Sequence, residues 1–197
     1  MTTPQFREIR ALYSTSTIRV YQAFNHAIAD VAVQNNNFSS VPGFKVDRAT
    51  WIKPSFCWMA YRSDYAQKDR NQERILAIDL SIEGFEKILS KATVVCKGSD
   101  AKLSEVVVQW DPERDVALNK LDYRSIQIGL KGSMARKYAQ GDFIVQITDV
   151  TEEFTAIKTL LDQGSRDLAE QRLPTERVYP LTPELEKILQ TSKTDST

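Results

Sequence analysis

The chain has 197 residues, of which 42% are hydrophobic and 26% are charged, a composition typical of a globular protein that buries one sizeable core. Its 26 basic side chains are balanced by 26 acidic ones, so any nucleic-acid binding would have to come from a local patch. One histidine and two cysteines outside any Cys/His cluster lead us to infer no metal site and a reducing compartment.

The hydropathy pattern bears on location. The N-terminal segment has no apolar stretch of the kind found in signal peptides, and the chain has no run of about eighteen apolar residues. We therefore expect no signal peptide, no membrane partner and a cytoplasmic protein.

The first predicted elements are a strand and a helix. Alternation of apolar and polar side chains over residues 16–24 predicts a strand. Asn25 is a suitable N-cap for the helix that follows, which carries an apolar stripe. A polar loop then leads to about residue 44.

The next segment, TWIKPSFCWMAYRS at residues 50–63, mixes aromatic and cationic side chains. Pro54 suits the first turn of a helix, and we predict one from Pro54 to about Gln67. Helical spacing divides its residues between an apolar side and a cationic-aromatic side. The apolar side, assigned to the core, holds Phe56, Met59 and Ala60; the other side, assigned to a site, holds Trp58, Tyr61, Arg62 and Tyr65. Lys53 and Ser55 stand where unpaired backbone N–H groups of a helix start could meet an anion.

The remaining pattern alternates strands and helices. Strands are predicted at residues 74–80, 105–111, 124–130 and 143–150, and helices at 81–92, 131–141 and from 151 to about 163. An Asp-Pro turn at residues 111–115 is expected to end the second of these strands.

These elements predict an α+β fold. We expect a single globular domain over residues 1–163, with a mixed or antiparallel sheet of about five or more strands and flanking helices. Residues 164–197 are more polar and contain three prolines, so we expect a C-terminal extension with a short helix at 183–189 and a frayed end.

Three glutamines interrupt the predicted strands, at Gln22, Gln109 and Gln127. An unpaired buried amide costs about 1–3 kcal/mol, so these side chains need partners or a wet cleft. Gly129, two residues after Gln127, would let a ligand or another backbone approach. Two interpretations stay open: a half-exposed sheet with solvated glutamines, or a polar groove across the sheet.

Arginines near aromatic residues form a second pattern. Residues 44–74 hold seven Lys or Arg against four Asp or Glu, a local excess within a neutral chain. Arginine with Trp or Tyr suits a planar phosphorylated ligand, because the guanidinium pairs with phosphate while the ring stacks on a base. Simple salt bridges are the alternative for each arginine. The set comprises Arg19, Arg48, Arg62, Arg114 and Arg124.

Several catalytic signatures are missing from the sequence. It has no phosphate-binding loop, no dinucleotide fingerprint and no nucleophile elbow. His26, at the start of a helix, has no sequence context of a catalytic triad. Asp111 and Glu113 form the best carboxylate pair for acid–base chemistry or Mg²⁺, but a solvated turn explains them better.

A set of motifs in order along the chain, REIR, IRVYQAF, TWIKPSF, WMAYRS, VQWDPERD, RSIQIGL and ITDVT, resembles a family known only as domain of unknown function 4291. The resemblance covers about residues 7–150. The family name implies no activity.

A weaker resemblance links IRVYQAF, with the helix after it, to the first strand and helix of ADP-ribosyltransferase-like folds, which hold NAD there. That resemblance implies that Gln22 takes the place of a histidine, with contacts from Arg19 or Tyr21. RSIQIGL and FIVQITDV resemble the closing strands of that fold, with Gln127 where the transferases usually carry a catalytic Glu. A neutral Gln stabilises a developing positive charge poorly, so this position puts the chemistry in doubt.

The leading hypothesis is a nucleotide-binding enzyme, a glycosyltransferase of ADP-ribosyltransferase type that uses NAD or a related phosphorylated nucleotide. The residues assigned to the chemistry are Gln22, Gln127 and Tyr61. The residues assigned to ligand binding are Arg19, Tyr21, Arg48, Trp51, Lys53, Ser55, Arg62, Ser63, Gln109 and Arg124. Two alternatives are a non-catalytic module that binds nucleotides or nucleic acid, and a scaffold whose polar motifs are internal hydrogen-bond networks.

Overall fold

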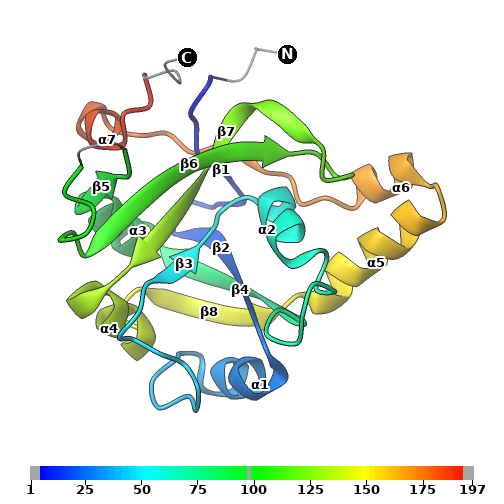
Figure 1. The fold of residues 1–197 in the computed structure, drawn as a ribbon, viewed down its shortest axis with the longest axis horizontal. Helices are drawn as coiled ribbons and strands as arrows, with labels where there is room; N and C mark the ends of the chain where they lie inside the picture. The colour runs from blue at the N-terminus through cyan, green and yellow to red at the C-terminus, as the bar shows by residue number, and fades with distance from the viewer. Residues whose placement is uncertain (1–4, 97–98, 193–197) are drawn as a thin grey trace.

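The computed structural model describes residues 5–96 and 99–192, and its strands form two main sheets that adjoin at one pair of strands (Figure 1). The first sheet is antiparallel, in the order β2 (Thr17–Phe24), β4 (Arg74–Ser81), β8 (Ile144–Asp149). The second is mixed, in the order β3 (Thr50–Ile52), β7 (Lys120–Leu130), β6 (Val106–Arg114), β5 (Ala92–Val94), where only the β5–β6 pair is parallel. The predicted α+β class is confirmed.

The two sheets are linked through Tyr21 and Lys53. The Tyr21 N–H donates to the Lys53 carbonyl at 2.7 Å, and the Lys53 N–H donates back at 3.3 Å. Strand β2 therefore lies beside the end of β3.

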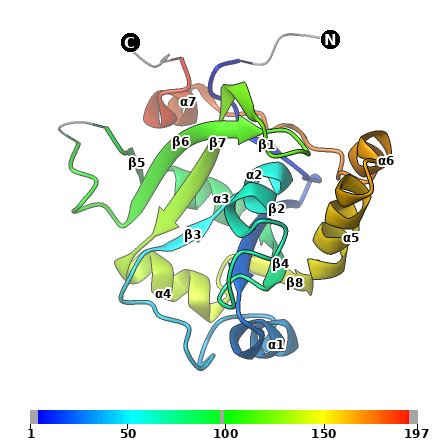
Figure 2. The same cartoon turned by 45° about the vertical axis from the view of Figure 1, so that its right-hand side comes forward.

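Seven helices lie around the sheets in the described residues. Their bounds are α1 (His26–Asn35), α2 (Phe56–Ser63), α3 (Ile82–Leu89), α4 (Gly132–Gln140), α5 (Thr151–Asp162), α6 (Arg166–Gln171) and α7 (Pro183–Leu189). Figure 2 shows α1 below the three-stranded sheet, with α5 and α6 together on one flank. None of the helices that the structure describes has both the length and the apolar character needed to cross a membrane.

Local signals placed most helix starts correctly. The Asn25 side chain accepts a hydrogen bond from the Ile28 N–H at 3.0 Å and caps α1. Ser81 caps α3 in the same way, through the Gly84 N–H at 3.1 Å, although the sequence offers only part of a capping box.

Buried side chains form two clusters. The larger one contains apolar residues of both main sheets, among them Val20, Ile78 and Ile128. The second surrounds α2 and α5, where the rings of Phe56 and Phe154 stack with centroids 3.9 Å apart. This second cluster fixes α2 against the sheets and so positions the residues that α2 presents to its other side.

The prediction of an Asp-Pro turn at residues 111–115 is wrong. Strand β6 continues through Pro112, which pairs with Arg124 of β7, and a register irregularity follows before Arg114. Such a bulge accommodates the missing N–H of proline within an antiparallel pair. The chain turns later, where the Leu118 N–H donates to the Asp115 carbonyl at 3.0 Å.

Helix α2 is shorter than the predicted segment from Pro54 to Gln67. It ends at Ser63, because Asp64 and Tyr65 both have left-handed backbones, with φ of 48° and 53°. Tyr65, predicted on the site side of this helix, is instead buried in the second cluster, and its hydroxyl donates to the Val116 carbonyl.

The described part of residues 164–197 is integrated with the rest of the fold. Strand β9 (Arg177–Val178) pairs with β1 (Arg10–Ala11), and α7 packs against β5. Tyr179 and Leu189 are buried in the larger cluster. The predicted helix at 183–189 is confirmed, while residues 193–197, expected to be frayed, lie outside the described residues.

Candidate functional site

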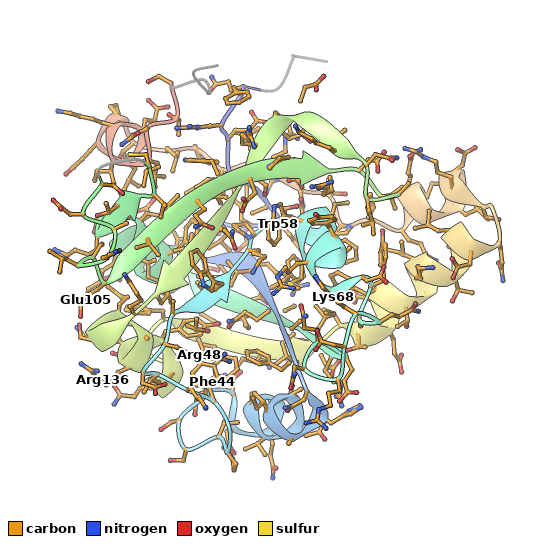
Figure 3. All side chains as sticks on the ribbon, in the orientation of Figure 1. Phe44, Arg48, Trp58, Lys68, Glu105 and Arg136 are labelled. Atoms are coloured by element: carbon orange, nitrogen blue, oxygen red, sulfur yellow. The ribbon has the colours of Figure 1, made fainter. Side chains whose placement is uncertain are left out.

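A cleft of about 750 Å³ lies where β2, β3, α2 and the β6–β7 pair come together. This volume is within the range of about 300–1,000 Å³ that small-molecule sites occupy. Figure 3 shows Phe44 and Arg48, two of its lining residues, on the loop that leads into β3. Seven of the residues predicted from the sequence line the cleft: Gln22, Arg48, Trp51, Lys53, Arg62, Gln109 and Gln127.

The strand register explains why Gln109 and Gln127 meet. They are directly opposed in the antiparallel β6–β7 pair, so their side chains leave the same face of the sheet. Gln127 Nε2 donates to Gln109 Oε1 at 2.8 Å and to Asp111 Oδ2 at 2.6 Å. The two amides and the carboxylate therefore form one connected network at the cleft.

The sequence predicts Asp111 in a solvated turn, and the structure corrects this prediction. It lies within β6 and is only partly exposed. Burial raises the pKa of its carboxyl, while the hydrogen bond from Gln127 and the charge of Lys53 act in the opposite direction. The sequence signal for this role is its spacing of two from Gln109, which puts both residues on one face of a strand.

Trp51 lies on the same face, against Gly129. A Cβ atom at Gly129 would stand 3.0 Å from the Trp51 ring and 2.8 Å from Val107 Cγ2. Glycine is required here because the indole packs directly on the backbone of β7. The close approach expected at Gly129 is thus made by a ring of the chain itself, and that ring lines the cleft beside Gln127.

Lys53 is a buried cation in this cleft. Its residue is 5% exposed, and its ammonium stands 5.1 Å from the centroid of the Trp58 ring. Burial, with a smaller effect from Arg62, lowers its pKa from 10.5 to about 7, and Asp111 acts the other way. A desolvated lysine with this pKa readily gains or loses a proton near neutral pH.

Three further cations line the cleft at more exposed positions. The Arg62 guanidinium donates to Gln72 Oε1 at 3.0 Å, a neutral partner. Across residues 5–96 and 99–192, no carboxylate lies within ion-pair distance of the four lining cations, which are Lys45, Arg48, Lys53 and Arg62. Among the described residues, Asp69 is the one carboxylate of the lining, and it accepts hydrogen bonds from the Asn71 N–H and from Gln72 Nε2.

Gln22 lies in the wall of the cleft, and both the oxygen and the nitrogen of its amide form hydrogen bonds. The Tyr138 hydroxyl donates to Gln22 Oε1 at 2.6 Å, and Gln22 Nε2 donates to Thr50 Oγ1 at 2.8 Å. All three side chains are buried. Gln22 therefore links β2, β3 and α4, which fixes the position of the wall.

The other predicted site residues lie outside the lining of the cleft. Arg19 forms a two-bond pair with Asp79 across the β2–β4 pair, at 2.8 and 2.9 Å. Tyr21 is buried among aromatic rings, which raises its pKa through desolvation. Tyr61 is exposed, and the guanidinium of Arg114 stacks 3.7 Å from its ring centroid.

Two more of these residues hold α2 or the N-terminal segment. Ser63 is buried and donates to the Met59 carbonyl at 2.9 Å. The Arg124 guanidinium stands 5.4 Å from the centroid of the Phe6 ring, and the Arg124 N–H donates to the Phe6 carbonyl.

The start of α2, predicted as an anion site, is occupied by the chain's own groups. Ser55 Oγ caps the helix by accepting from the Trp58 N–H, and it donates to Glu113 Oε1 at 2.9 Å. The Phe56 N–H donates to Glu176 Oε1 at 2.7 Å. Burial raises the pKa of Glu176 to about 8, with a further contribution from the nearby Glu113. Two internal carboxylates thus surround this helix terminus.

Sequence reasoning missed other residues of the cleft, chiefly on the loop before β3. Phe44 and Lys45 line the cleft, and the Phe44 ring stacks on Phe38 with centroids 4.6 Å apart. The local excess of basic residues was the available signal for Lys45, but no periodic pattern places loop residues in space. Within the described part of the chain, no group of three or more His, Cys, Asp or Glu is arranged to hold a metal ion.

Comparison with known proteins identifies a family for this chain. The model of a family described as "Domain of unknown function (DUF4291)" matches residues 8–179. No curated protein gives a significant match to the chain.

Proposed function

The chain belongs to the family described as a domain of unknown function (DUF4291), a description that names no activity, so we propose a function from the cleft. We propose that the cleft binds a phosphorylated nucleotide. The observation that carries the proposal is the group of four cations that line one cleft without a carboxylate partner in the described residues. Arginines elsewhere in the fold, such as Arg19 and Arg74, are paired with aspartates.

Lys53 supports an anionic ligand most directly. A buried ammonium is costly to desolvate, and the pKa of Lys53 falls to about 7 as a result, although the charge of Asp111 acts in the opposite direction. A phosphate bound beside Lys53 and Arg62 would add negative charge and stabilise the charged form of Lys53. Phosphate bound to the more exposed Arg48 would gain the two-bond geometry that guanidinium offers.

The remainder of the cleft suits the organic part of a nucleotide. Trp51 provides an aromatic face on which a base can stack, an interaction worth about 1–3 kcal/mol. The amides of Gln109 and Gln127 stand beside it and can form hydrogen bonds with a base or a sugar. Ring, amides and cations together match the base and phosphates of one nucleotide.

NAD is the first nucleotide to test, because the sequence has a weak resemblance to ADP-ribosyltransferase-like folds. Transfer of ADP-ribose breaks the bond from ribose to nicotinamide, the bonding electrons leave with nicotinamide, and an acceptor nucleophile takes its place. A carboxylate normally stabilises the cationic ribose of such a reaction. Gln127 offers a neutral amide that is already bonded to Gln109 and Asp111. The arrangement therefore supports binding more strongly than turnover.

Calorimetric titration with NAD, ADP-ribose and ADP tests the proposal. We expect binding of at least one of them and a rise in melting temperature, since a ligand at about 100 times its Kd stabilises by about 2.7 kcal/mol. Arg62→Ala should weaken binding. Arg70→Ala removes an exposed cation that does not line the cleft and should leave binding unchanged.

Two outcomes decide between the hypotheses. No heat and no change in melting temperature with any of the three nucleotides would contradict the proposed function. Release of nicotinamide from NAD would show turnover, whereas binding without release would leave a nucleotide-binding module.

A further inference from the structure

Asp111 determines how the two amides of the cleft are turned. An ionised carboxylate only accepts hydrogen bonds, so the Gln127 atom 2.6 Å from Asp111 Oδ2 has to be the amide nitrogen. The same nitrogen stands 2.8 Å from Gln109, so the Gln109 atom that faces it has to be the oxygen. One carboxylate therefore fixes the orientation of both glutamines.

This orientation leaves a defined pair of groups for a ligand. Both hydrogens of Gln127 Nε2 are used within the network, which leaves Gln127 Oε1 as an acceptor. Gln109 uses its oxygen, which leaves its NH₂ group as a donor. Neither Gln127 Oε1 nor Gln109 Nε2 has a hydrogen-bond partner in the part of the chain that the structure describes, and both residues line the cleft.

We propose that this acceptor–donor pair selects nucleotides whose base presents an amino group beside an unprotonated ring nitrogen, the edge of adenine or cytosine. The amino group would donate to Gln127 Oε1, and the ring nitrogen would accept from Gln109 Nε2. Hypoxanthine and uracil present the reverse edge, a carbonyl beside a ring N–H. The proposal rests on the proposed function, since it requires a nucleotide in this cleft.

Trp51 provides the ring on which the base would stack in this mode. Its ring is held on Gly129, which lies two residues from Gln127 on the same face of β7. In the proposed mode, a base stacked on this ring lies beside the opposed glutamine pair and pairs its edge with Gln127 Oε1 and Gln109 Nε2. The cations Lys53 and Arg62 of the same cleft are then left for the phosphates.

A reversed edge would be rejected for a simple reason. A carbonyl would face Gln127 Oε1 and an N–H would face the Gln109 NH₂ group, so two lone pairs and two hydrogens would oppose each other. Contacts of this kind separate matched from mismatched bases by about tenfold or more. The shapes of adenine and hypoxanthine are otherwise nearly the same, so their ratio isolates this effect.

Isothermal titration of the intact chain with ADP and IDP, and with CDP and UDP, tests the inference. We expect ADP to bind about tenfold or more tightly than IDP, and CDP more tightly than UDP. Gln109→Glu keeps the oxygen that faces Gln127 but removes the donor, so the ADP/IDP ratio should fall towards one. The added negative charge should weaken the binding of all the nucleotides alike, because each carries phosphates, so the ratio of affinities is the quantity compared. Gln163→Glu, at an exposed position, is the matched control and should keep the ratio.

Asp111→Asn provides a second variant, because an asparagine can present either its oxygen or its NH₂ group and no longer fixes the glutamines. Its ratio should also fall, with thermal melting used to confirm that it folds. Similar affinities for ADP and IDP in the parent chain, or tighter binding of IDP, would overturn the inference while leaving nucleotide binding intact. An unchanged ratio in folded Gln109→Glu would also overturn it. Failure of all four nucleotides to bind would remove the proposed function and this inference together.

Discussion

The Tyr138 hydroxyl donates a hydrogen bond to Gln22 Oε1 at 2.6 Å, joining residues 116 positions apart in the sequence. Both residues are buried, and the bond ties α4 to β2 at the wall of the cleft. It shows how a polar side chain in the middle of a strand is accommodated without solvent.

Tyr138→Phe should therefore destabilise the protein. The change keeps the ring but leaves Gln22 Oε1 buried without its donor, which costs about 1–3 kcal/mol. Urea denaturation measures the loss. Tyr61→Phe is the control, since Tyr61 is exposed and should unfold like the parent. Equal midpoints for the two variants would show that the buried bond contributes little.

Lys53 predicts a particular dependence of stability on pH. Its pKa in the folded state is about 7, below the 10.5 expected when unfolded, so the unfolded state binds more protons between these values. Stability from this group should therefore rise with pH from about 7 to 10.5, by a few kcal/mol at most.

Lys53→Met removes that dependence. The variant should be more stable than the parent at pH 6, where Lys53 is charged, and the difference should shrink by pH 9. Denaturant unfolding at both pH values measures it. If the difference in unfolding free energy between the variant and the parent were the same at pH 6 and pH 9, the lowered pKa of Lys53 would be contradicted.

Nucleotide binding should also take up a proton. A phosphate beside Lys53 favours its charged form, so at pH 8, above its pKa of about 7, binding draws a proton from solvent. Calorimetry in two buffers with different ionisation heats should give different apparent enthalpies for the parent chain. The same heat in both buffers would place the phosphate away from Lys53.

Glu176 should contribute a pH dependence of stability opposite in sign to that of Lys53, and Glu176→Gln tests it. The pKa of Glu176 is raised from 4.5 to about 8, so the folded state holds an extra proton between these values, and stability from this group falls as pH rises through them. Glutamine keeps an oxygen for the Phe56 N–H but cannot ionise. The variant should gain stability over the parent most clearly near pH 8. Exposed Glu184→Gln should show no such trend.

Local features of the fold could be predicted from the sequence. The alternation at residues 16–24 and the Asn25 cap act within a few residues, and both elements formed as expected. The short strands β3 and β5 were missed, because three residues carry too little periodicity. The predicted turn at Pro112 does not form, because the pairing of Pro112 with Arg124 on another strand outweighs the local turn preference of the Asp-Pro sequence.

The residue types of the site could be predicted from the sequence better than their positions in space. A polar groove was one of the two interpretations open for the three glutamines, and all three line the cleft. Which arginines line it depends on distant partners: Arg19 is held by Asp79, 60 positions away in sequence, and no local pattern identifies that partner. The opposition of Gln109 and Gln127 depends on strand register, which the sequence alone leaves open.

The pairing of β1 with β9 has a consequence for how the chain acquires its structure during synthesis. Arg10 pairs with Val178, and the Tyr179 N–H donates to the Ile9 carbonyl at 2.8 Å. Strand β1 is synthesised more than 160 residues before β9, so it stays without this partner while the intervening residues are translated. This pairing therefore forms late in synthesis, and a ribosome stalled before β9 would expose the unpaired edge of β1 to chaperones.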